Sequence, residues 1–151
     1  MLPFDGSAEP SLVIDGLSLW ILGKANSESY RGVELQVHAV CTAPGATVSV
    51  TGPLIGTNDI AAFMWEMEAM HEWKATTASL RPVEPNLSVE LKSSAIGRLQ
   101  VEVGITPDNN TQQHQFIFEL DLSYLPGPIA QCRKVLAAFP VVRYQTFRVT
   151  P

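Results

Sequence analysis

The chain has 151 residues, of which 46% are hydrophobic and 17% charged, a composition typical of one folded domain and not of a disordered chain. Its 15 acidic and 10 basic side chains give a formal charge of −5, which argues against sequence-independent nucleic-acid binding, since that needs clustered Lys and Arg. We therefore expect a single domain over residues 1–151. Because no basic, apolar leader opens the sequence and no apolar run approaches the ~20 residues of a membrane span, we expect a cytoplasmic protein with no membrane contact.

The two cysteines, Cys41 and Cys132, lie far apart in the chain and form no CxxC motif. A disulfide between them is one reading. Two reduced, buried thiols are the reading that we favour for a cytoplasmic protein.

Several segments alternate apolar and polar residues with a period of two, the pattern of strands that are buried on one face. Segments with this pattern are 33–39, 87–92, 98–105 and 115–122, and earlier strands are expected at 12–22 and 46–51. Turn-rich connections separate them at Pro44-Gly45, 93–97 and 106–113. Clean alternation is typical of antiparallel pairing, so we predict a mostly antiparallel sheet of about six to eight strands.

Two helices are predicted, at about 59–74 and 128–139, which makes the fold class α+β. Thr57, Asn58 or Asp59 would cap the first helix. At ~100° per residue its core-facing side would carry Ile60, Phe63, Met64, Met67, Met70 and His71. The second helix would start near Pro128, end before Pro140, and bury Ile129, Cys132, Leu136 and Phe139.

The opposite side of the first helix presents Trp65 beside a run of carboxylates. Residues 1–73 contain nine acids and two bases, whereas residues 74–151 contain six acids and eight bases. Tryptophan is enriched at binding hot spots, and carboxylates steer a basic partner. The candidate partner-binding residues are therefore Trp65, Glu66, Glu68 and Glu72. Two alternatives stay open: the acids form only a solvated helix face, or the N-terminal segment or the tail 141–149 covers Trp65.

No catalytic motif is complete. His71-Glu72 begins like the zinc-protease motif HExxH, but Ala75 stands where the second histidine is required. GxSxG, the phosphate-binding GxxxxGK[ST] and GxGxxG do not occur. We therefore expect no catalytic residues, no metal and no cofactor.

Two further functions compete with partner binding. A small hydrolase would use His71 or carboxylates on a shared strand face, such as Glu102, Glu119 and Asp121. A sheet-based ligand-binding or scaffold module would show a concave face lined by Ile117 and neighbouring aromatics. If Trp65 is buried, the candidate surface moves to the polar sheet face with Gln100, Glu102, Glu119 and Asp121.

From Thr57 to Phe139 the motifs follow a characteristic order. The motifs are a helix ending at Trp73, then Glu84-Pro85-Asn86-Leu87, Gly97-Arg98-Leu99, Phe116-Ile117-Phe118-Glu119-Leu120, and a helix ending Leu136-Ala137-Ala138-Phe139-Pro140. This order resembles the WapI-type immunity proteins, bacterial antitoxins encoded beside polymorphic secreted toxins. The loop 106–113 departs from the resemblance, because it is polar where aromatic or proline-rich residues are expected.

The resemblance implies a cytoplasmic inhibitor and not an enzyme. Its partner would be a cognate toxin domain, often a nuclease, which it occludes without itself binding nucleic acid. An acidic surface would complement the basic cleft of such a domain. The resemblance supplies no catalytic residues, and it specifies neither the oligomeric state nor the role of residues 1–56.

Overall fold

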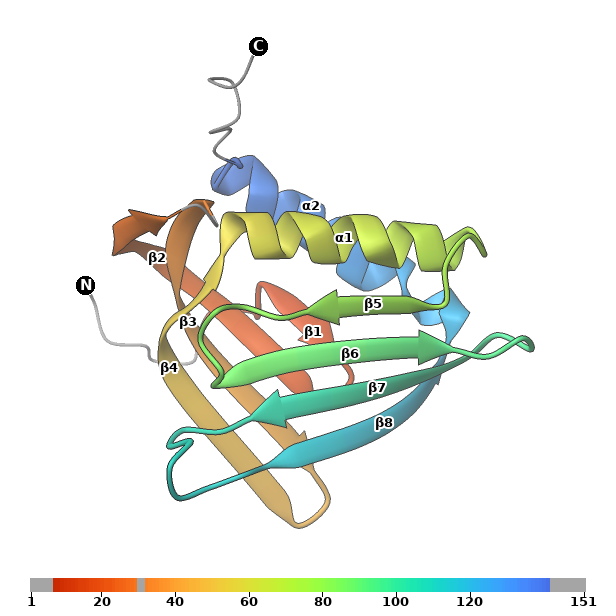
Figure 1. The fold of residues 1–151 in the computed structure, drawn as a ribbon, viewed down its shortest axis with the longest axis horizontal. Helices are drawn as coiled ribbons and strands as arrows, with labels where there is room; N and C mark the ends of the chain where they lie inside the picture. The colour runs from red at the N-terminus through yellow and green to blue at the C-terminus, as the bar shows by residue number, and fades with distance from the viewer. Residues whose placement is uncertain (1–6, 30–31, 142–151) are drawn as a thin grey trace.

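The computed structural model describes residues 7–29 and 32–141 and contains two four-stranded antiparallel sheets with two helices (Figure 1). The first sheet is formed by β1 (Leu12–Ile14), β2 (Leu17–Ser29), β3 (Gly32–Ala43) and β4 (Ala46–Gly56). The second is formed by β5 (Thr77–Leu80), β6 (Leu87–Ser93), β7 (Arg98–Ile105) and β8 (Gln115–Asp121). In each sheet every strand pairs with its neighbour in sequence. The α+β class and the antiparallel pairing are confirmed, but the strands divide between two sheets.

The helices are α1 (Thr57–His71) and α2 (Pro126–Ala138), and a short 3-10 turn, η1 (Leu122–Tyr124), precedes α2. They lie side by side across the same end of the two sheets, so that together they close the core there (Figure 1). In the described part of the chain, neither helix is long and apolar enough to span a membrane. The tail 141–149, which the sequence left as a candidate cover for Trp65, lies almost entirely outside the described residues.

The strand predictions differ from the structure mainly near the N-terminus. The segments 87–92, 98–105 and 115–122 agree with β6, β7 and β8 to within one residue, and 33–39 and 46–51 are shorter than β3 and β4. The single strand predicted at 12–22 is wrong, because a tight turn at Asp15 and Gly16 divides it into β1 and β2. A Cβ atom on Gly16 would lie 2.2 Å from the carbonyl oxygen of Thr42, so only glycine fits this turn.

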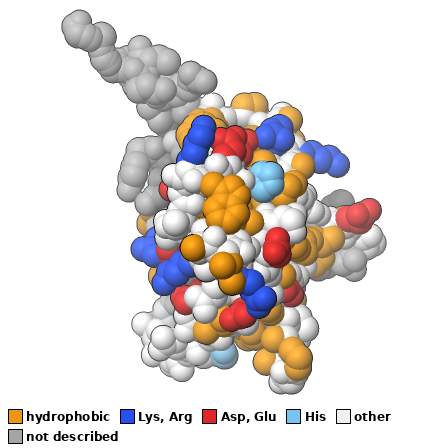
Figure 2. All heavy atoms as spheres, turned by 90° about the vertical axis from the view of Figure 1, so that its right-hand side faces the viewer, with side chains coloured by type: hydrophobic (Ala, Val, Ile, Leu, Met, Phe, Trp, Pro, Cys, Tyr) orange, Lys and Arg blue, Asp and Glu red, His pale blue; other side chains and the backbone are white. Residues whose placement is uncertain are grey.

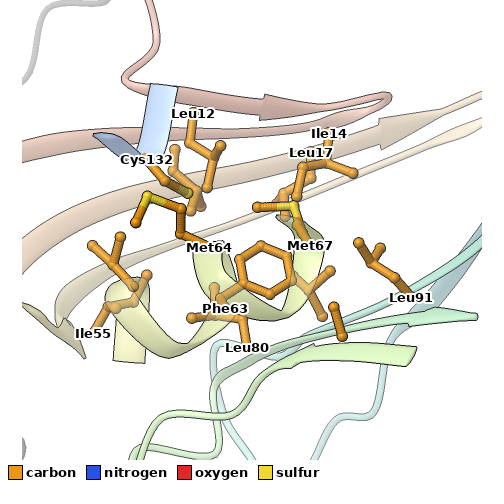
Figure 3. Close-up of a cluster of buried hydrophobic side chains, with 14 of the residues drawn as sticks. Leu12, Ile14, Leu17, Ile55, Phe63, Met64, Met67, Leu80, Leu91 and Cys132 are labelled. Carbon is orange, nitrogen blue, oxygen red and sulfur yellow. The ribbon is translucent and has the colours of Figure 1, made fainter. Parts of the chain in front are cut away.

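The core lies between the inner faces of the two sheets, and the apolar side of α1 packs into it. Phe63 and Met67 are fully buried and lie between residues of both sheets, with Leu17 from β2 on one side and Leu80 from β5 on another (Figure 3). Cys132 of α2 completes the cluster (Figure 3). Full burial of a large apolar side chain contributes about 1.5–3 kcal/mol, so this side of α1 is a main source of stability.

The predicted ends of α1 are corrected by tertiary contacts. Gly56 is the N-cap, and Asp59 accepts a hydrogen bond of 2.9 Å from its N–H. Thr57 is instead buried, where its hydroxyl accepts from the Val33 N–H at 3.2 Å. At the other end His71 is exposed, so its assignment to the core face is wrong. His71 is the last residue of α1, where cover by neighbouring elements ends.

Both cysteines are free and buried, so the disulfide reading is wrong. Burial, with a smaller contribution from Asp15, raises the pKa of Cys41 to about 11, and burial raises the pKa of Cys132 to about 12. The thiols are therefore protonated and unreactive at neutral pH. In α2, Ile129 and Cys132 are buried as expected, while Leu136 and Phe139 are only half-buried.

Candidate functional site

The outer side of α1 is open to solvent around Trp65. The side chain of Trp65 is 60% exposed, so the condition for its role as an anchor is met. Ala62 and Ala69 lie three residues before it and four after it, which places them on the same side of the helix. Both alanine side chains are short, which is consistent with the exposure of the indole.

The three candidate carboxylates lie on the flanks of this ridge, and each has a partner within the chain. Glu66 accepts a hydrogen bond of 2.7 Å from the backbone N–H of Ser79 in β5. Glu68 pairs with Arg133 of α2 at 2.7 Å. Glu72 pairs with Lys74 at 3.1 Å. The outer side of α1 thus lies between β5 and α2, with Trp65 between the two flanks.

These partners change the electrostatics expected from the sequence. The acids of α1 follow one another along the chain without a base, yet Arg133 and Lys74 neutralise two of them in space. Exposed ion pairs of this kind contribute about 0–1 kcal/mol and exchange partners readily. The Glu66 contact also covers part of β5, which is an edge strand of the second sheet.

The second candidate surface is the outer face of the second sheet. The strand register brings Gln100 opposite Glu119, Glu102 opposite Ile117, and Arg98 opposite Asp121, so the four predicted residues share one face. Arg98 pairs with Glu119 at 3.3 Å, and Asp121 accepts from the Ser123 N–H at 2.9 Å to cap η1. That hydrogen bond holds the pKa of Asp121 below its ordinary value.

Glu90, which lies opposite Glu102 on the same face, is also engaged. Burial alone would raise its pKa, but hydrogen bonds from Arg81 and Ser79 and the nearby cations outweigh burial and lower it. Glu90, Glu119 and Asp121 therefore serve ion pairs and a cap, which are structural roles.

The hydrolase alternative requires His71 within hydrogen-bond reach of a carboxylate. Although His71 is exposed, it makes no such bond to any residue of the described chain. Over residues 7–29 and 32–141, no three His, Cys, Asp or Glu side chains come together as metal ligands.

The ligand-binding alternative needs aromatic side chains beside Ile117. Phe116 and Phe118 are half-buried on the core side of β8, and Ile117 is exposed on the other side. Since neighbouring residues of a strand point to opposite faces, the aromatic-lined surface around Ile117 does not form.

Two further exposed hydrophobic residues lie at the end of α1 and on the β6–β7 hairpin, namely Trp73 and Ile96. Figure 2 shows this end of the molecule, where hydrophobic side chains lie near its centre among charged ones. Ile96 was not among the residues predicted to bind a partner. An isoleucine within the short connection 94–97 is nevertheless a signal of an exposed apolar side chain, because such turns are usually polar.

Comparison with known proteins identifies the family. The model of the immunity protein WapI-like family matches residues 12–140, which include every helix and strand from β1 to α2 and extend beyond the 57–139 region of the resemblance. Comparisons with curated proteins and with solved structures found no match. Because the family model covers most of the 151 residues, the chain belongs to the WapI-like immunity protein family.

Proposed function

We propose that this immunity protein neutralises its cognate toxin domain by direct occlusion, with Trp65 on the outer side of α1 as the apolar anchor. Family membership supports an immunity role in general. The observation that supports this particular surface is a tryptophan that is 60% exposed on a helix whose other side is buried in the core. Such a side chain adds little to folding, whereas a rigid aromatic loses little entropy on binding and buries a large area.

Glu66, Glu68 and Glu72 would orient the toxin around this anchor. Binding would exchange the ion pairs of Glu68 with Arg133 and of Glu72 with Lys74 for cations of the partner. The net charge of −5 favours a basic toxin domain, such as a nuclease, and accelerates its encounter with the chain. In this proposal the protein acts in the cytoplasm as a stoichiometric inhibitor and not as an enzyme.

The test is the affinity of Trp65→Ala for the toxin domain encoded beside the gene, purified in an inactive form and titrated calorimetrically. Loss of a central anchor costs at least about 2 kcal/mol, so we expect binding about 30-fold weaker or more. The melting temperature should stay that of the parent protein, since Trp65 is exposed. Unchanged affinity would reject α1 as the binding surface.

Glu68→Gln is the matched comparison on the same helix. It removes the charge but keeps the length of the side chain, so its effect should be small and confined to low salt. Stoichiometry separates inhibitor from enzyme: occlusion requires one chain per toxin domain, and complete toxin inactivation at far lower ratios would refute it.

A further inference from the structure

Two exposed hydrophobic residues, Trp73 after the end of α1 and Ile96 at the tip of the β6–β7 hairpin, define what we call the hairpin patch. These side chains are 63% and 83% exposed, respectively. They belong together because the indole of Trp73 lies over the hairpin: a Cβ atom built on Gly97 would be 3.5 Å from its Cη2 atom. The patch lies at the end of the molecule that faces the viewer in Figure 2.

Trp73 occupies a backbone position that normally belongs to glycine. Its N–H donates to the Met70 carbonyl at 3.0 Å, and the Lys74 N–H donates to the Ala69 carbonyl at 2.8 Å. These two bonds are the Schellman motif that ends a helix, in which the residue at the Trp73 position is left-handed. Trp73 accordingly has φ 62°, a conformation that is disfavoured for a bulky side chain. Glycine would adopt this conformation without strain, so the end of the helix does not itself require a tryptophan here.

Ile96 is likewise not required by the turn that carries it. The turn is closed by hydrogen bonds to Ser94, from the Gly97 N–H to its carbonyl at 3.1 Å and from the Arg98 N–H to its hydroxyl at 3.2 Å. Gly97, with φ +85°, supplies the left-handed residue. The backbone therefore holds Ile96 rigidly in solvent, which is the preorganisation that a binding anchor needs.

The charges beside the patch indicate what kind of segment would bind. An open groove of about 590 Å³ runs from Ile96 past Lys92, Arg98 and Glu119. Arg98 pairs with Glu119 at 3.3 Å, while Lys92 forms no ion pair with any residue that the structure describes. Although Lys92 interacts with Glu90 at longer range, the lining of the groove itself carries two cations, Lys92 and Arg98, and one carboxylate, Glu119. An apolar side chain beside a carboxylate would complement both this charge and the exposed Ile96.

We infer that the hairpin patch is a second anchor point for the cognate toxin domain, and that it receives a toxin segment with an apolar side chain next to a carboxylate. The inference rests on the proposed function for the identity of the partner. Trp65 and Trp73 are eight residues apart, which is about 12 Å along a helix, so one standard-sized interface can include both.

The experiment measures the affinity of the inactive toxin domain for four variants, together with their melting temperatures. Trp73→Gly places the favoured residue in the left-handed position, so its melting temperature should equal or exceed that of the parent while affinity falls about 30-fold. Ile96→Ser should weaken binding about fivefold without changing stability. If Trp73 had only a structural role, Trp73→Gly would not lose affinity while keeping or raising its melting temperature.

Two variants complete the design. Lys92→Glu should weaken binding about fivefold at low salt and less at high salt. Val83→Ser is the control, because Val83 is 58% exposed but lies in the β5–β6 connection, at the opposite end of β6 from the patch. Its affinity should equal that of the parent.

The outcomes separate this inference from the proposed function. If Trp73→Gly and Ile96→Ser bind the toxin domain with parental affinity while Trp65→Ala binds it more weakly, the inference is overturned and the proposed function stands. If Trp73→Gly and Ile96→Ser bind the toxin domain more weakly while Trp65→Ala binds with parental affinity, the hairpin patch is supported and Trp65 is rejected as the anchor. Failure of the toxin domain to bind the parent protein overturns both, and stronger binding by Lys92→Glu overturns the carboxylate as the recognised group.

Discussion

Replacing Phe63 by alanine tests whether the apolar side of α1 carries the fold. Phe63 is 0% exposed and lies between the two sheets, where it contacts the same cluster as Met67 and Leu80 (Figure 3). The substitution removes the whole ring and leaves a cavity that rigid strands on both sides cannot close. For a fully buried phenylalanine the free energy of unfolding should fall by about 3–5 kcal/mol.

The expected change in melting temperature follows from chain length. At about 2–4 °C per kcal/mol for a domain of roughly this size, the loss corresponds to a decrease of about 6–20 °C. Thermal unfolding followed by circular dichroism measures it, and urea titration gives the free energy independently.

Trp65→Ala is the matched control, since it also replaces an aromatic residue by alanine on the same helix, two residues away. An exposed site of this kind should change stability by no more than about 0.5 kcal/mol. If Phe63→Ala melts within about 2 °C of the parent protein, the buried and exposed sides of α1 are assigned backwards, and the reasoning about Trp65 is refuted with them.

Three further predictions concern the packing of the sheets and the buried thiols. Gly16→Ala should destabilise the fold by about 1–3 kcal/mol, because its Cβ atom would lie 2.2 Å from the carbonyl oxygen of Thr42. Gly127→Ala is the control and should be neutral or stabilising, because no atom lies within 4 Å of the Cβ position there. Equal melting temperatures of the two variants would contradict the close packing at Gly16. Cys41 and Cys132 should react with a thiol reagent at pH 8 only in denaturant, and fast labelling of the native protein would contradict their burial. Since folding raises the thiol pKa from 9.0 to about 11 for Cys41 and about 12 for Cys132, their contribution to stability is complete below pH 9 and should be lost as the pH rises towards 12.

The local sequence pattern was sufficient to predict a strand or a helix face wherever the periodicity of buried side chains decides the structure. The alternation from Arg98 to Ile105 predicted β7 to the residue, because one face of that strand is buried and the other is wet. The helical spacing of Phe63 and Met67 likewise predicted which side of α1 is buried. It left open whether another segment covers Trp65, which the structure shows to be 60% exposed.

The same reasoning failed where a residue depends on a distant part of the chain. Thr57 was one of three residues expected to cap α1, but its hydroxyl instead accepts a hydrogen bond from the N–H of Val33, which is 24 residues away along the chain. His71 was assigned to the core because spacing alone does not show where neighbouring elements stop covering a helix. The division of eight strands into two sheets also depends on how the segments pack, which alternation within each strand does not encode.

For the candidate site, the sequence by itself determined the residue types: a tryptophan opposite the apolar side of the first helix, a run of carboxylates, and a motif order similar to an immunity family. Only the tertiary structure decided their environment, because Arg133, which pairs with Glu68, is 65 residues away along the chain. It alone also placed Trp73, which follows the end of α1, over Gly97, the residue after Ile96 in the β6–β7 hairpin. Periodicity is a property of each segment, whereas charge pairing and surface continuity arise only when segments pack together.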